Sequence, residues 1–148
     1  MPIMEASPTK EFDLFHGASQ RVIGEIGKNS EEVVFENDSI IFKNDEEALY
    51  IYELVEGEVD IVVLERENMH YTITRLGEIF GWSALVEPYV YTATARCSMN
   101  TKVLRISRDT IEDAVKRHPN EGLFIYKHLT GIIAQRLRNA YQHIYRQH

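Results

Sequence analysis

The sequence predicts a mainly β protein, a β jelly roll (double-stranded β-helix) with short N-terminal helices and a long C-terminal helix. Short runs rich in Val, Ile, Tyr and Thr recur at roughly ten-residue intervals between residues 31 and 106. Turn residues such as Asn37-Asp38 and Glu56-Gly57 separate them. After residue 107, apolar residues recur at helical spacing instead. The 148 residues suffice for one domain, so we expect a single unit over 1–148.

Composition restricts the function classes. The chain is 44% hydrophobic and 26% charged, as in ordinary globular proteins. A formal net charge of -7 argues against a protein whose main role is to coat nucleic acid or an anionic membrane. One cysteine, Cys97, cannot form an internal disulfide, which fits a reducing compartment. No signal-peptide or membrane-spanning segment is recognisable, so we expect a cytoplasmic protein.

The first zone, residues 1–30, is expected to hold short helices. Val22, Ile23 and Ile26 have helical spacing, and Gly17, Gly24 and Gly27 are interpreted as breakers. The second zone, 31–106, is expected to form the jelly roll, because seven or eight short strands are typical of a sandwich or jelly roll. Its strand runs are EEVVF, SIIF, ALYIYELV, EVDIVVLE, HYTITRL, YTATARC and KVLRIS.

The third zone, 107–148, is expected to be helical. Ser107 is a candidate cap for a helix that ends before Pro119, where a longer helix of about 25 residues begins. That helix is longer than a small barrel is wide, at about 1.5 Å per residue, so part of its apolar stripe should contact something besides its own core. We therefore expect a homodimer through this helix. The candidate seam residues are Leu129, Ile133, Leu137, Ala140 and Ile144.

The same helix is basic after Glu121. Its cationic residues are Lys127, Arg136, Arg138 and Arg146. We interpret them as a solvated face that flanks the dimer seam, in preference to a nucleic-acid contact. No helix-turn-helix pattern follows Glu121. We therefore expect no direct nucleic-acid binding by this chain, whether it is a free-standing module with a protein partner or a fragment of a transcription regulator.

The order of these parts resembles the cyclic-nucleotide-binding domain family, especially the effector domain of Crp/Fnr-type regulators. The resemblance extends from about Phe15 to Tyr145 and rests on ALYIYELVEGEVDIVV, GEIFGWSAL and the Thr-Ala strand that follows. It implies a phosphate-binding cassette with backbone amides at Gly81, Ser83 and Ala84 and a hydroxyl at Thr92. The candidate cassette residues are Gly77, Glu78, Ile79, Phe80, Gly81, Trp82, Ser83, Ala84, Tyr91, Thr92 and Ala93. It also implies that Ala140 and Tyr141 of the long helix close over a ligand.

Two positions depart from the family pattern. Trp82 stands where the ribose-binding Glu would be, and Tyr91 stands where the phosphate-binding Arg would be. A buried phosphate needs a matched cation or several donors, so we do not expect tight binding of cyclic AMP. Arg96 is no substitute, because strand alternation places it on the opposite face from Tyr91. Three alternatives remain: the two rings fill the nucleotide space, they line a pocket for a different, more apolar effector, or residual cyclic-nucleotide binding persists.

Other chemistry has little support. His16 and His70 are candidates for a haem site, but the spacings that bind haem or metal are missing, so we expect neither cofactor and only a small effector. His143 and His148 are interpreted as solvent-facing, and Cys97 as a core or half-buried strand residue. Nucleophile elbows and P-loops are absent from the sequence. We expect a non-enzymatic sensor, or a ligand-free dimerisation or docking module.

Overall fold

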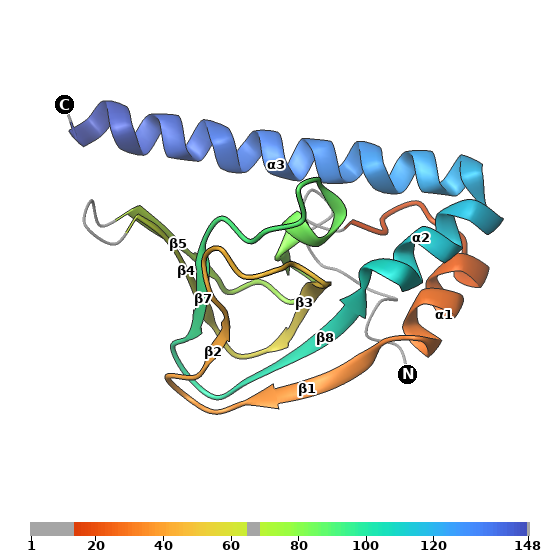
Figure 1. The fold of residues 1–148 in the computed structure, drawn as a ribbon, viewed down its shortest axis with the longest axis horizontal. Coiled ribbons are helices and arrows are strands. Elements are labelled where there is room, and N and C mark those ends of the chain that lie inside the picture. The colour runs from red at the N-terminus through yellow and green to blue at the C-terminus, as the bar shows by residue number, and fades with distance from the viewer. Residues whose placement is uncertain (1–13, 65–68, 148) are drawn as a thin grey trace.

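The structure is a computed structural model that describes residues 14–64 and 69–147. The described chain runs from a first helix through a β region to two final helices (Figure 1). Its elements are α1 (Gln20–Lys28), β1 (Glu31–Phe35), β2 (Ile40–Phe42), β3 (Tyr50–Glu56), β4 (Val59–Leu64), β5 (Met69–Ile73), β6 (Ile79–Phe80), the 3-10 helix η2 (Trp82–Leu85), β7 (Thr94–Cys97), β8 (Thr101–Ser107), α2 (Arg108–Arg117) and α3 (Pro119–Gln147).

The strands form two antiparallel four-stranded sheets within the described residues, ordered β1-β8-β3-β6 and β2-β7-β4-β5. In the first sheet, Val103 of β8 lies opposite Val33 and Leu54. In the second sheet, β4 pairs with both β5 and β7. Because neighbours in sequence, such as β1 and β2, lie in different sheets, the arrangement is the expected jelly roll. The sequence did not predict β6, since two residues are too few for alternation to be recognised.

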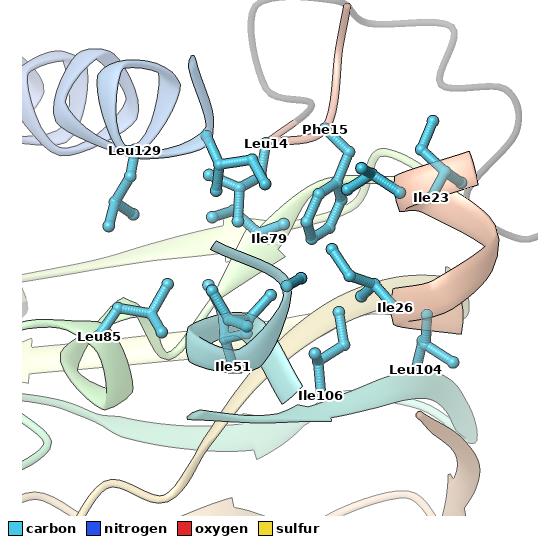
Figure 2. Packing of buried hydrophobic residues seen from close by; sticks show 14 of the residues in the cluster. Leu14, Phe15, Ile23, Ile26, Ile51, Ile79, Leu85, Leu104, Ile106 and Leu129 are labelled. Carbon is cyan, nitrogen blue, oxygen red and sulfur yellow. The ribbon is translucent and has the colours of Figure 1, made fainter. Parts of the chain in front are cut away.

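Two apolar clusters hold the layers together. In the first, Leu14 and Phe15 pack with Ile51, Ile106 and Leu129 between the helices and one sheet (Figure 2). The second includes Phe42, Tyr52, Leu54, Val59, Ile61, Ile73, Phe80, Tyr91, Ala95 and Val103. The first cluster combines residues of all three zones, whereas the second lies entirely within residues 31–106. Burial of apolar surface in the first cluster therefore packs the helices against the jelly roll.

Helix α1 corrects one expectation about the N-terminal zone. Gly24 and Gly27 lie inside this helix and do not break it. A helical glycine costs only about 1 kcal/mol relative to alanine. The side chains of Val22, Ile23 and Ile26 are buried, and burial of apolar side chains outweighs that cost. The start of the helix is capped, because the Ser19 hydroxyl accepts a hydrogen bond from the Val22 amide at 3.2 Å.

The boundary between α2 and α3 confirms the expected helix signals. The Ser107 hydroxyl accepts a hydrogen bond from the Thr110 amide at 3.1 Å, which caps α2. Helix α2 ends before His118, and Pro119 occupies the first position of α3, where its missing N–H is not needed. Only His118 therefore separates the end of α2 from the start of α3.

Helix α3 has 29 residues and crosses the side of the barrel toward the β4–β5 hairpin (Figure 1). Its first half is anchored, because Ile125, Leu129 and Ile132 are buried in the core. Leu129 is therefore a core residue of its own domain, which corrects its expected place in a dimer seam. None of the described helices combines the length and apolar character needed to cross a bilayer.

Candidate functional site

The cassette segment, residues 77–93, turns sharply at its two glycines. Gly77 and Gly81 have φ angles of 87° and 78°, in the left-handed region. A Cβ atom on Gly81 would lie 3.2 Å from the Tyr52 ring and 3.3 Å from the Phe42 ring. Glycine is therefore required at position 81 both for its backbone conformation and for the close approach of two aromatic rings.

The backbone of η2 is already partly engaged. The Ala84 amide donates to the Gly81 carbonyl at 3.2 Å, so it does not point freely at a ligand. The Ala84 carbonyl accepts from Nε of Arg108 at 2.7 Å, and the guanidinium carbon lies 3.8 Å from the Tyr89 ring centroid. Arg108 thus ties the cassette segment to the start of α2, which positions the loop independently of any ligand.

Tyr91 belongs to the interior of the sandwich. Its ring is 4% exposed and stacks on Phe42, with 3.8 Å between centroids and 12° between planes. Its hydroxyl donates to the Tyr50 carbonyl at 2.6 Å, and burial raises the pKa of this phenol. The cavity left beneath the cassette segment is only about 30 Å³. Two cassette positions, Trp82 and Tyr91, both line that remnant.

A much larger cavity of about 530 Å³ lies between the β4–β5 hairpin and the second half of α3. Trp82, Thr92 and Ala93 of the cassette segment border it, so the two cavities adjoin. The other described lining residues are Val63, Met69, His70, Tyr71, Ile133, Arg136, Leu137, Asn139, Ala140, Gln142, His143 and Arg146. Its volume falls within the range of about 300–1,000 Å³ that is usual for small-molecule sites.

Arg136 connects α3 to the cassette segment. Although cationic, it is only 8% exposed, and its Nη2 lies 3.2 Å from Oε2 of Glu78 and 3.2 Å from the Ile79 carbonyl. Glu78 is itself 7% exposed. A buried ion pair of this kind is costly to break, because removing one partner leaves an uncompensated charge. The pair therefore links the position of α3 to the start of the cassette segment.

Aromatic rings surround the same guanidinium. Its central carbon lies 4.6 Å from the Tyr71 ring centroid and 5.3 Å from the Trp82 ring centroid, within cation–π range. Burial raises the pKa of Tyr71, while the nearby positive charge of Arg136 opposes that shift. The cavity wall thus combines one buried cation with two flat apolar surfaces.

The sequence-predicted residues separate into three groups. Gly81, Trp82, Ser83 and Tyr91–Ala93 border the small cavity. Gly77, Glu78, Ile79, Phe80 and Ala84 shape the segment, and each of them is buried. On α3, Ala140 borders the large cavity, whereas the neighbouring Tyr141 is 61% exposed and is not a lining residue.

The seam candidates on α3 also differ from one another. Ile133, Leu137 and Ala140 border the large cavity, and Leu137 is also 49% exposed. Ile144 is 44% exposed and is not among the described lining residues. The outward placement of Arg96 is observed, since it is exposed on β7.

Sequence reasoning missed Arg136 and misplaced His143. Arg136 was expected on a solvated basic face, and His143 was expected to face solvent. Both border the large cavity, and the Nε2 atom of His143 is buried. The available signal was spacing: Arg136 follows Leu129 by seven residues and Ile133 by three, so it lies on the apolar stripe. A cationic side chain on that stripe points toward the interior of the domain, as the burial of Arg136 shows.

The histidine candidates do not gather into a metal centre. His70 bonds Asp60 through Nδ1 at 2.9 Å, while the ring of His16 lies 6.1 Å from that of His128. In residues 14–64 and 69–147, no group of three or more His, Cys, Asp or Glu side chains could hold a metal ion. Position 148 lies outside the described residues.

Cys97 is buried, and burial raises the pKa of its thiol.

Comparison with known proteins identifies relatives of this fold. The family model for the cyclic nucleotide-binding domain matches residues 32–118. A search of curated proteins finds no significant match. A structure from Geobacter metallireducens, described as a cyclic nucleotide-binding protein, has 25% identity and a TM-score of 0.73, covering 86% of this chain and 94% of that one.

Two further structures have lower identity and support the fold alone. A cyclic nucleotide-binding domain from Methylobacillus flagellatus has 17% identity and a TM-score of 0.79, covering 99% of this chain and 80% of that one. The Thermus thermophilus catabolite activator protein has 21% identity and a TM-score of 0.71 over 88% of this chain. The matched region spans 61% of that activator.

Proposed function

The chain belongs to the cyclic nucleotide-binding domain family, and from that premise we propose that it is a regulatory, non-enzymatic module that senses a small effector. We propose further that this effector is not a tightly bound cyclic nucleotide. The observation that carries this second statement is the buried ring of Tyr91, which stacks on Phe42 at the position where the family pattern has an arginine.

The phosphate of a cyclic nucleotide would meet an unsuitable surface beneath the cassette segment. Burying one negative charge requires a cation or several directed donors, and Tyr91 directs its hydroxyl to the Tyr50 carbonyl. Trp82 offers no carboxylate for a ribose hydroxyl. About 30 Å³ of space remains there, well short of the roughly 300 Å³ at the lower end of small-molecule sites. The larger cavity beneath α3 is the better candidate for an effector.

A ligand in the larger cavity would contact both the cassette segment and α3, and a change in their relative position could carry a signal. Trp82 and Thr92 come from the cassette segment, and Ala140 comes from α3. The ion pair between Arg136 and Glu78 already joins those two elements. Ligand binding would bias the position of α3 only by as much as its affinity differs between two helix positions. The output is therefore a shift of α3 against the barrel.

A non-catalytic role suits the family and the site. The family is regulatory and generally without catalytic activity, and the lining residues include no arrangement of nucleophile and base that we can assign to a reaction. The single cysteine, which is buried, and the acidic composition fit a protein of the cytoplasm.

The proposal is tested by calorimetry with cyclic AMP and cyclic GMP on the wild-type chain. We expect no binding in the micromolar range, because both polar anchors are replaced. In a Trp82→Glu/Tyr91→Arg variant, provided it keeps a cooperative melt, we expect cyclic AMP binding to become measurable. Clear micromolar binding by the wild type would refute the proposed loss of nucleotide specificity.

We also propose that the chain forms a homodimer through the outer face of α3. Several large apolar side chains on this helix are exposed: Leu123, Phe124, Leu137, Tyr141, Ile144 and Tyr145. The steps from Leu137 to Tyr141 to Ile144 are four and three residues, the spacing of a two-helix seam. If no effector binds, the same face supports the alternative of a ligand-free dimerisation module.

Sedimentation equilibrium tests the dimer. The wild type is expected at twice the chain mass, and Ile144→Asp is expected to shift it toward one chain, because a carboxylate would be buried in the seam. Val34→Asp is the matched control, since Val34 is an exposed apolar residue on the edge strand β1, away from α3. An unchanged mass for Ile144→Asp would place any dimer contact elsewhere.

A further inference from the structure

The large cavity has a cationic wall. Arg136 and Arg146 both border it, together with the histidines His70 and His143. Among the described lining residues there is no Asp or Glu. Two carboxylates contact lining residues from outside the cavity: Glu78 pairs with one nitrogen of Arg136 from the cassette side, and Asp60 bonds His70. An anion is therefore the charge class that this cavity would attract.

Two buried nitrogen atoms at this wall have no hydrogen-bond partner among the described residues. They are Nη1 of Arg136 and Nε2 of His143. Arg136 is more than nine-tenths buried, so water does not readily compensate for the missing acceptor. Its other terminal nitrogen, Nη2, donates hydrogen bonds to Oε2 of Glu78 and to the Ile79 carbonyl. The guanidinium thus retains donor capacity next to a cavity of ligand size, and an unsatisfied buried donor requires an explanation.

The surrounding surfaces favour a flat ligand body. Tyr71 and Trp82 lie beside the guanidinium, and Ile133, Leu137 and Ala140 add aliphatic surface from α3. Aromatic and aliphatic walls bind planar apolar groups, while a few polar atoms fix the ligand's orientation. The two buried unpartnered nitrogen atoms of the wall, Nη1 of Arg136 and Nε2 of His143, both come from α3.

We infer that the effector is a small organic oxyanion with a planar apolar body, and that its charged end binds Arg136 of α3 with His143 beside it. This inference rests on the proposed function. It differs from the phosphate contact of the family pattern, because the guanidinium comes from the helix and not from the cassette strand. A carboxylate and a phosphate share the required chemistry, since both accept from a guanidinium fork.

The test uses benzoate, phenyl phosphate and benzamide as probes. Trp82 is the only tryptophan, so its fluorescence reports binding in this cavity, and calorimetry provides the affinities. Benzamide has nearly the same shape as benzoate without the charge. We expect benzoate or phenyl phosphate to bind about tenfold or more tightly than benzamide, as for a charge-assisted hydrogen bond. The comparison of benzoate with phenyl phosphate distinguishes the two oxyanions.

Three variants assign the charge preference to Arg136. Arg136→Gln/Glu78→Gln removes both charges and should abolish the preference, and a retained cooperative melt establishes that it folds. Glu78→Gln alone should strengthen oxyanion binding several-fold, because the competing carboxylate is removed. Arg138→Gln is the matched control: Arg138 is exposed on the same helix and bonds Gln135, so the preference should not change.

The outcomes separate this inference from the proposed function. If benzamide binds as tightly as benzoate, the oxyanion inference is wrong while an effector cavity remains. If none of the three probes binds at millimolar concentration, both are wrong. If Arg136→Gln/Glu78→Gln does not fold, Glu78→Gln decides: unchanged or weaker oxyanion binding overturns the inference.

Discussion

The cassette segment and the cavity beneath α3 are neighbours that share Trp82, Thr92 and Ala93, yet they are built in opposite ways. Under the cassette segment, aromatic packing leaves about 30 Å³. Beneath α3 the chain leaves about 530 Å³ and places a buried arginine on the wall. The first region has the glycine turns of the expected cassette, with Trp82 and Tyr91 at the positions where the family pattern has charged side chains. The second region has a buried cation, Arg136, but its described wall is not formed by a glycine turn.

From this difference we propose that the cassette segment keeps its backbone path although its side chains no longer suit a phosphate. The path of the cassette segment is fixed by interactions that involve no ligand: Gly81 beneath two rings, and Arg108 bonded to the Ala84 carbonyl. Ligand class must instead be judged from the side chains that border open space.

The largest effect is expected from Tyr91→Arg, which would place a guanidinium in the interior of the sandwich. The aromatic stack on Phe42 and the bond to the Tyr50 carbonyl would be lost, and a buried unpaired cation would replace them. We expect the free energy of unfolding to fall by about 3 kcal/mol or more. Urea denaturation followed by circular dichroism provides the measurement.

Tyr91→Phe is the control for that substitution. It keeps the ring stack and removes only the hydroxyl, so the expected loss is about 1 kcal/mol. Equal stabilities for the two variants would mean that Tyr91 does not pack in the core. The contrast between aromatic packing under the cassette segment and a charged wall beneath α3 would then be lost.

Much of the fold was predictable from the sequence, because period-2 alternation and turn residues directly report half-buried strands. The first strand run, EEVVF, coincides with β1, and Ser107 caps α2 as its hydroxyl and position suggested. The two glycines inside α1 were misread, since local propensity is outweighed when three neighbouring side chains become buried.

The site was predictable only where it is local in sequence. The replacements at Trp82 and Tyr91 could be recognised from their spacing to Gly81 and Thr92. Arg136 could not be assigned in the same way, because its partner Glu78 is 58 residues away and only the crossing of α3 over the barrel brings them together. Which part of an apolar stripe is buried in its own domain is likewise a tertiary property, since Leu129 is buried whereas Ile144 is 44% exposed.

The smallest change in stability is expected from Ala140→Phe, which tests the cavity side of the comparison. Ala140 borders the 530 Å³ cavity, so a ring can enter open space and the free energy of unfolding should change by less than about 1 kcal/mol. The same ring should weaken benzoate binding about tenfold or more, because it occupies ligand volume.

Tyr141→Phe is the matched control, since Tyr141 is the next residue, 61% exposed and not among the described lining residues. Calorimetry with benzoate on both variants, beside thermal melts, gives the two quantities. If Ala140→Phe binds benzoate like the wild type, the ligand lies outside this cavity, and the contrast with the cassette segment would no longer identify the sensing site.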